Sequence, residues 1–203
     1  AVTGKGQIEC TAERSSLHET RDPRASGRIG LKDIDINSVS GSIPTLLFVI
    51  FQMMFAIITP ALIVASVAER MKFSAFLIFV VIWTTFVYDF AAHWTWSLGS
   101  AGTAVGWTGA LGSLDFAGGT VIHITSGWGG LVVALMLGRR LGYGKLPMEP
   151  HNISLVVLGA ALLWVGWFGF NGGSALTATD DASAAIINTQ SAIVSGGASL
   201  ELP

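Results

Sequence analysis

The chain has 203 residues, of which 51% are hydrophobic and only 12% are charged, against about 25% charged residues in an ordinary soluble domain. This composition excludes an intrinsically disordered chain, and a net charge of −2 leaves no basic surface for nucleic acid. The single cysteine, Cys10, excludes an internal disulfide framework and a cysteine-cluster metal site. Together with a mean hydropathy of +0.62, these values indicate a membrane protein.

Charged residues are concentrated at the start of the chain. Residues 1–42 hold six Lys or Arg and six Asp or Glu, whereas residues 43–203 hold only five and seven. We therefore place a boundary near Ser42 and predict that residues 1–42 form a polar lead-in without regular structure, facing outward. This segment contains no apolar run of the kind found in a signal peptide.

Four apolar stretches are long enough to cross a bilayer, which needs about 20 residues at ~1.5 Å rise each. They cover residues 43–67, 73–96, 116–138 and 153–176. Pro60 lies inside the first stretch and is expected to kink its helix. A fifth stretch begins near Ala184 and is expected to stop at Pro203 before it could span. The predicted fold class is all-α, a polytopic bundle of transmembrane helices.

Lysine and arginine assign the sides of the membrane. They occur in residues 68–72 and 139–152, whereas the loops 97–114 and 177–183 contain none. Cytoplasmic loops are enriched in Lys and Arg, so residues 68–72 and 139–152 are predicted to be cytoplasmic and the other two loops to face outward. We therefore predict a multi-pass protein of the cell membrane.

The third stretch carries an ionisable residue at membrane depth, His123. It shares a helical stripe with small residues at spacings of three and four, namely Gly119, Gly127, Gly130, Ala134 and Gly138. Small residues in one stripe let a neighbouring helix approach closely, so His123 is expected to point into the bundle. An ionisable group inside a membrane is costly and usually serves a transport pathway or a cofactor.

Asp115 is predicted to begin the same helix, where two compatible interpretations apply. It can act as an N-cap that accepts backbone N–H groups, or as an acid that stabilises a cation at the mouth of a cavity. Aromatic side chains lie near the same depth, and a ring face can hold a cation with about 0.5–2 kcal/mol. The candidates are Phe55, Trp94, Trp96, Trp107, Phe168 and Phe170.

Four segments together resemble the ammonium transporter family (Amt/Mep/Rh), in family order. They are FQMMFAIITPALIVASVAERMKFSA (51–75), AHWTW (92–96), DFAGGTVIHITSGWGGLVVALMLGRR (115–140) and HNISLVVLGAALLWVGWFGFNGGSAL (151–176). The likeness covers about residues 44–195. The family fold has eleven transmembrane helices and forms trimers with a pore through each subunit. The resemblance implies that this chain is a fragment corresponding to the third to sixth helices and the start of the seventh.

The resemblance also implies an outer ammonium-binding site. Trp96, Phe55 and Ser174 match the residues that recruit ammonium through cation–π contacts and a hydroxyl acceptor. Phe55 and Phe170 match the two phenylalanines that gate the pore below that site. The implied function is the transport of ammonium or ammonia, and the resemblance implies no cofactor, no metal ion and no enzymatic activity.

Two further positions take roles from the resemblance. Asp115 matches the acid near the outer site, and His123 matches the first of two pore histidines that hydrogen-bond to each other. Desolvation penalises a bare ammonium ion far more than neutral ammonia, so the proton is expected to leave near the mouth of the pore. Ammonia would then pass the histidine.

The sequence departs from the family pattern at several points. The second pore histidine belongs to a late helix without a counterpart here, and the polar lead-in stands where the first two helices would be. Phe90 replaces a usual proline, and the last residues after about Ser195 leave the pattern. We therefore expect an incomplete pore. The implied partners are ammonium or ammonia, membrane lipid, two further copies in a homotrimer of the complete protein, and a cytoplasmic nitrogen-regulatory protein.

A haem-binding membrane anchor is the main alternative. His93 and His123 could serve as axial ligands from neighbouring helices, although the predicted topology places His93 near the outer surface. A Soret band in the purified protein would favour this alternative. An intramembrane hydrolase using Asp115 or Asp89 lacks a supporting G-x-S-x-G or H-E-x-x-H motif.

Overall fold

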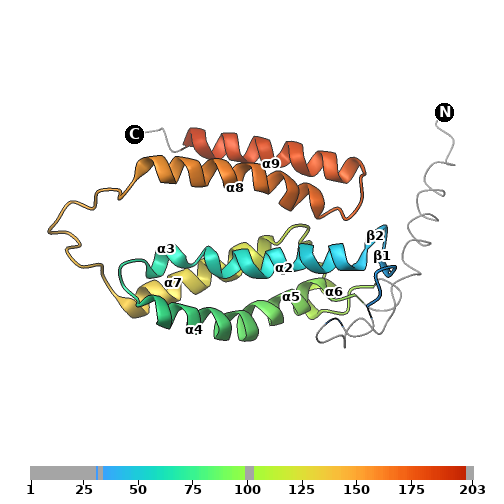
Figure 1. Ribbon diagram of the computed structural model, residues 1–203, viewed down its shortest axis with the longest axis horizontal. Helices are drawn as coiled ribbons and strands as arrows, with labels where there is room; N and C mark the ends of the chain where they lie inside the picture. The colour runs from blue at the N-terminus through green and yellow to red at the C-terminus, as the bar shows by residue number, and fades with distance from the viewer. Residues whose placement is uncertain (1–30, 32–33, 99–102, 200–203) are drawn as a thin grey trace. The chain divides into compact units, whose positions relative to one another are not determined.

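The computed structural model describes residues 31, 34–98 and 103–199, and these are mostly helical (Figure 1). Four helical runs among them are long and apolar enough to cross a membrane: Thr45–Val67, Phe73–Trp96, Gly119–Leu137 and Ile153–Gly173. Each lies within one of the four predicted stretches, and the all-α fold class is confirmed. Contacts divide the chain into two units, Ala1–Met136 and Leu137–Pro203.

A small hairpin precedes the first run. Strand β1 (Val39–Ser40) pairs antiparallel with β2 (Ile43–Pro44), and Gly41 turns the chain with a φ of +63°. Glycine adopts this left-handed conformation without steric cost. The hairpin is fixed to the helix because Thr45 N donates to Ser38 O at 2.8 Å. The boundary predicted near Ser42 therefore falls inside a hairpin, and most of the predicted lead-in lies outside the described residues.

The first run is interrupted after Pro60, as predicted. Helix α2 (Thr45–Ala61) contains Pro60 and is followed by the short helix α3 (Val64–Val67). Between them, Leu62 N donates to Ile58 O and Ile63 N donates to Pro60 O, both at 3.1 Å. The second bond joins residues three apart instead of four, so the chain changes here from α-helical to turn geometry. Ile63, at this interruption, is completely buried.

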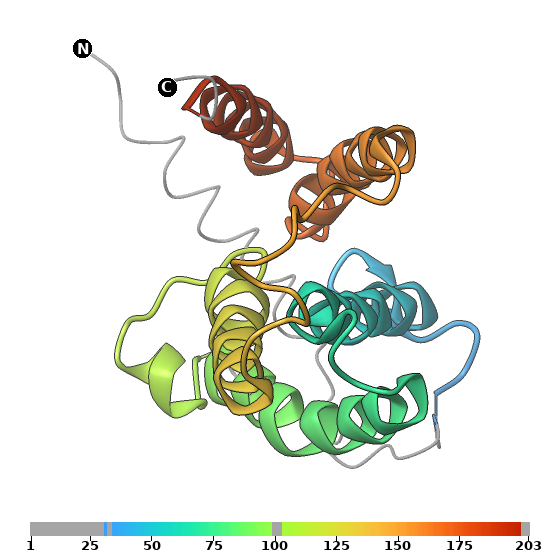
Figure 2. The ribbon, with the colours of Figure 1, turned by 90° about the vertical axis from the view of Figure 1, so that its left-hand side faces the viewer.

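The next two runs each contain a π-helical segment, in which hydrogen bonds join residues five apart. The second run consists of α4 (Phe73–Trp83), η3 (Thr84–Tyr88) and α5 (Asp89–Trp96). The third consists of η4 (Gly119–Ile124) and α7 (Thr125–Leu137). Both π segments pack against α2, and η4 also packs against α5. Figures 1 and 2 show the three runs of the first unit side by side.

The predicted stripe on the third run is confirmed only in part, because Gly130 is buried whereas Gly119 and Gly127 are exposed. The helix begins at Gly119 and not near residue 116, and its first turns are π-helical, so positions calculated for an α-helix are rotated. The buried positions of this run are Val121, Ile122, Ser126, Gly130 and Val133. A side chain added at Gly119 or Gly127 would meet no atom within 4 Å.

The closest approach on this run is made by Gly130, and it supplies a prediction. A Cβ added there would lie 2.8 Å from Ser66 Oγ, closer than such atoms pack. We expect Gly130→Ala to lower stability by about 1 kcal/mol, the lower end of the range for overpacking, because the Ser66 hydroxyl can rotate away. Removing the hydroxyl with Ser66→Ala should restore most of the loss in the double variant. Thermal unfolding in detergent measures both, and Gly127→Ala, with open space around it, is the control.

The second unit is a pair of helices. Helix α8 (Ile153–Gly173) lies beside α9 (Asp180–Ser199) (Figure 1). Two side-chain hydrogen bonds join them, from Trp164 Nε1 to Gln190 Oε1 at 3.0 Å and from Asn171 Nδ2 to Thr189 Oγ1 at 2.7 Å. Helix α9 begins four residues before the start predicted near Ala184.

Candidate functional site

The site starts from an aromatic pair in the first unit. Phe55 on α2 and Trp96 at the end of α5 lie with ring centroids 5.7 Å apart and ring planes at 88°. Phe51, one helical turn before Phe55, contacts it at 4.8 Å and 68°. Edge-to-face arrangements of this kind are favoured between aromatic rings. Phe55 is only 2% exposed, whereas Trp96 is half-buried. The more accessible aromatic surface therefore belongs to Trp96.

A hydrogen bond fixes the indole of Trp96. Its Nε1 donates to the main-chain carbonyl of Asp115 at 2.8 Å. The indole is thus held from two sides, by Phe55 on the first run and by Asp115 just before the third. The structure brings together three residues that the resemblance placed at the outer site: Phe55, Trp96 and Asp115.

The carboxylate of Asp115 is occupied by backbone groups. It accepts hydrogen bonds from four N–H groups at the start of η4. These groups would otherwise lack acceptors, because no earlier helical turn supplies carbonyl oxygens there. Oδ1 accepts from Gly118 at 2.5 Å and Gly119 at 3.0 Å, and Oδ2 accepts from Thr120 and Val121, both at 2.9 Å. Such bonds to a charged acceptor are stronger than neutral ones, and the helix start favours negative charge.

The expected N-cap role of Asp115 therefore takes a different form. The residue lies four positions before the helix and not at its first position. Gly118 links Asp115 to the start of η4. Its φ of +99° folds the chain back, so that consecutive N–H groups face the carboxylate. A side chain is strained at this φ, which makes glycine the suitable residue.

A loop element that sequence reasoning missed holds the end of α5. The short helix α6 (Trp107–Ala110) packs against α5. Thr108 Oγ1 donates to Trp94 O at 2.8 Å, so in its 3.0 Å contact with Thr95 Oγ1 the donor is Thr95. Trp94 and Trp107 also meet edge to face at 5.9 Å. Of the residues in this contact, the sequence singled out only Trp94 and Trp107, as aromatic side chains that could hold a cation.

His123 lies in η4 next to Val121 and Ile122, which are completely buried, and its own side chain is exposed. The predicted bundle also includes the membrane-capable run of the second unit, so the expectation that His123 points into the bundle stays a prediction.

The other two predicted residues belong to the second unit. Phe170 and Ser174 lie at the end of α8 and just beyond it, and both are half-buried. Ser174 Oγ donates to Phe170 O at 2.8 Å, which leaves the oxygen lone pairs of Ser174 able to accept another donor. These two residues are linked to each other within the second unit.

Comparison with known proteins places this arrangement in a family. A profile described as the Ammonium Transporter Family matches residues 16–201, so the likeness extends beyond residues 44–195 on both sides and into the polar lead-in. The chain is 48% identical to an ammonium transporter of Archaeoglobus fulgidus over 168 residues, covering 82% of this chain and 41% of that protein.

Two further relatives agree. An ammonium transporter of Bacillus subtilis is 49% identical over 169 residues, covering 82% of this chain and 40% of its own length. Another, from Aquifex aeolicus, is 51% identical over 154 residues, covering 76% of this chain and 34% of its own length. The chain thus spans about two fifths of the first two relatives. All three are named as transporters and not as enzymes. With its four membrane-capable helices, the chain is a multi-pass membrane protein, and it belongs to the ammonium transporter family.

Proposed function

We propose that this chain forms part of a pathway that carries ammonium or ammonia across a membrane. The observation that supports this most directly is the aromatic pair of Phe55, midway along the first membrane-capable run, and Trp96, at the end of the second. The main chain of Asp115 holds Trp96 in this position. An aromatic ring face attracts a cation by about 0.5–2 kcal/mol without requiring a charged partner. Such a site can concentrate ammonium and still release it.

Trp96 carries the recruitment step in this proposal. Its ring is the accessible member of the pair, whereas Phe55 is buried behind it. Phe55 therefore supports the indole in the observed conformation, and its proposed gating role requires the ring to move. The resemblance assigns ammonium binding to Ser174, whose oxygen can still accept a hydrogen bond, and gating to Phe170.

The proton would leave ammonium before the molecule passes the apolar part of the pathway. Burial penalises the charged ion strongly and the neutral molecule only weakly. Asp115 is poorly suited to accept that proton because four N–H groups already bind its carboxylate. We assign Asp115 a positioning role, and His123 the role of the pore group that contacts ammonia.

The proposal includes sides and partners. Residues 68–72 and 139–152 would be cytoplasmic, where a nitrogen-regulatory protein would dock, and the complete transporter would be a homotrimer. The second pore histidine would come from a later helix, so residues 1–203 alone would form an incomplete pore. The haem alternative is disfavoured by the relatives, which are named as ammonium transporters.

A chimera tests the proposal. Residues 44–195 would replace the matching segment of the Bacillus subtilis transporter, and methylammonium uptake would be measured in proteoliposomes. We expect uptake by the chimera and a loss of up to about thirtyfold with Trp96→Leu, which removes cation–π binding of up to about 2 kcal/mol. His123→Ala should cause a larger loss.

Controls separate the parts of this proposal. Trp128→Leu changes an exposed tryptophan that lies away from the aromatic pair and should leave uptake unchanged. A folded chimera without uptake would contradict the proposed function. Uptake by residues 1–203 alone, abolished by His123→Ala, would contradict only the incompleteness of the pore.

A further inference from the structure

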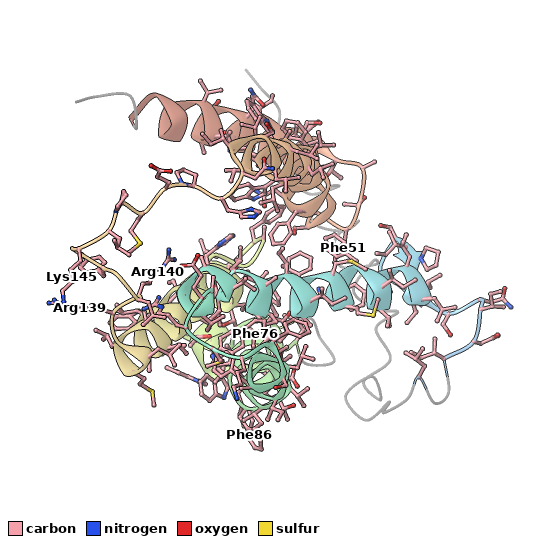
Figure 3. All side chains as sticks on the ribbon, turned by 60° about the vertical axis from the view of Figure 1, so that its left-hand side comes forward. Phe51, Phe76, Phe86, Arg139, Arg140 and Lys145 are labelled. Atoms are coloured by element: carbon pink, nitrogen blue, oxygen red, sulfur yellow. The ribbon has the colours of Figure 1, made fainter. Side chains whose placement is uncertain are left out.

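The loop between α7 and α8 concentrates positive charge. Residues 138–148 contain Arg139, Arg140 and Lys145, and the first acidic residue after α7 is Glu149. Figure 3 shows the three cations around the stretch of chain that follows α7. The loop begins directly after a membrane-capable run that ends at Leu137, so it starts at the surface of the bilayer.

The loop has a defined turn structure. Tyr143 N donates to Arg140 O at 3.1 Å, and Lys145 N and Leu146 N both donate to Gly142 O at 2.9 Å. Gly142 has a φ of +78°, a conformation that favours glycine. The guanidinium of Arg139 lies 5.7 Å from the centre of the Tyr143 ring, within cation–π range. The main-chain hydrogen bonds fix the turns on which Arg140 and Lys145 lie, and Tyr143 is a neighbour of the Arg139 side chain.

Large apolar side chains are interleaved with the cations. Leu141 is 92% exposed, Leu146 is 66% exposed and Tyr143 is 60% exposed. The preference of Lys and Arg for cytoplasmic loops accounts for the charges, but it gives no reason for leucines in water. A surface that combines cations with protruding apolar groups suits the boundary of a bilayer, where the cations meet phosphates and the apolar groups enter the acyl region.

The other positively charged turn of the chain contrasts with this loop. In residues 68–72, Arg70 Nη1 donates to Ala134 O of α7 at 3.5 Å, so that this arginine is directed at the protein itself. Leu141 and Leu146 instead extend from their turns into open surroundings. Lys72 and Phe73 at the end of the 68–72 turn are exposed as well, but residues 138–148 hold three cations beside Leu141, Tyr143 and Leu146.

We propose that residues 138–148 bind anionic phospholipid headgroups at the surface of the membrane that the helices cross. Arg139, Arg140 and Lys145 contact the phosphates, and Leu141, Tyr143 and Leu146 enter the interface beside them. The loop thereby fixes the depth at which α7 ends. This role does not depend on the transport of ammonium.

A fluorescent label tests the proposal in the full chain. Met148→Cys, in a Cys10→Ser background, would carry a polarity-sensitive dye, and the protein would be placed in vesicles of phosphatidylcholine alone or of equal parts phosphatidylcholine and phosphatidylglycerol. We expect a blue shift of the emission in the anionic vesicles. Added salt should weaken the shift because it screens charges.

Two variants separate charge from apolar insertion. Each cation near an anionic surface strengthens binding about fivefold, so changing Arg139, Arg140 and Lys145 together to Gln should weaken it roughly a hundredfold and abolish the shift. Leu141→Ser with Leu146→Ser keeps the charges and should reduce the shift. A dye at Leu114→Cys, in the outward loop without Lys or Arg, is the control and should give the same emission in both vesicles.

Three outcomes would overturn the proposal: equal emission at position 148 in both vesicles, a shift that survives loss of the three cations, or a shift that requires an added acidic protein. The last would assign the loop to a protein partner. Because the readout is independent of uptake, a failure here leaves the proposed transport function intact, and the reverse also holds.

Discussion

Asp115→Ala is expected to give the largest loss of stability of any single substitution in the first unit. The change removes all four N–H bonds at the start of η4. A bond to a charged group contributes about 1.5–3 kcal/mol, and bonds that share one carboxylate add only in part, so the expected loss is roughly 3–5 kcal/mol. Thermal unfolding of the purified protein in detergent measures it.

Asp115→Asn separates geometry from charge. The amide has the same shape, but only its oxygen accepts, so it can keep one pair of N–H bonds and places an NH₂ group against the other pair. We expect about half the loss of the alanine variant. An asparagine variant as unstable as the alanine variant would contradict the count of hydrogen bonds and would mean that the charge itself stabilises the site.

Gly106→Ala is expected to detach the outer loop from α5. An added Cβ would collide with the carbonyl oxygen of Trp94 and would lie 2.6 Å from His93 O, and both atoms are main chain at the end of a helix. Neither can move without breaking α5, so the loop must move instead. The expected loss is about 3 kcal/mol, the upper end of the range for overpacking.

Protease cleavage measures this detachment. The loop 97–114 should be cut faster in Gly106→Ala, because separation from α5 also breaks the hydrogen bond from Thr108 to Trp94 O. Thr108→Val removes that bond without the collision and should cost about 1 kcal/mol. If Gly106→Ala leaves both the cleavage rate and the unfolding temperature unchanged, the close approach of the loop to α5 is contradicted.

Much of the fold could be predicted from the pattern of apolar and charged residues. Four uncharged stretches of sufficient length predicted four membrane-capable runs, and Pro60 predicted the interruption of the first. These features depend on composition and on proline stereochemistry, which act locally. The close meeting of Phe55 with Trp96 came from the family resemblance and not from their spacing.

The remaining features depend on contacts between distant segments. No residue pattern marks η3 or η4, because a π segment forms where packing accommodates one extra residue in a turn. For that reason the helical stripe calculated for residues 119–138 is only partly correct. The four bonds to Asp115 likewise require the left-handed turn at Gly118, whose role is invisible until the chain is folded.

The dual use of Asp115 has a mechanical consequence. Its main-chain carbonyl holds Trp96, while its side chain holds the first residues of the run that carries His123. One residue is thus a rigid link between an aromatic surface at the end of one helix and the start of another. Movement of the indole pulls on the main chain of Asp115 and, through the carboxylate, on η4. We therefore expect the indole of Trp96 and the first turn of η4 to move together.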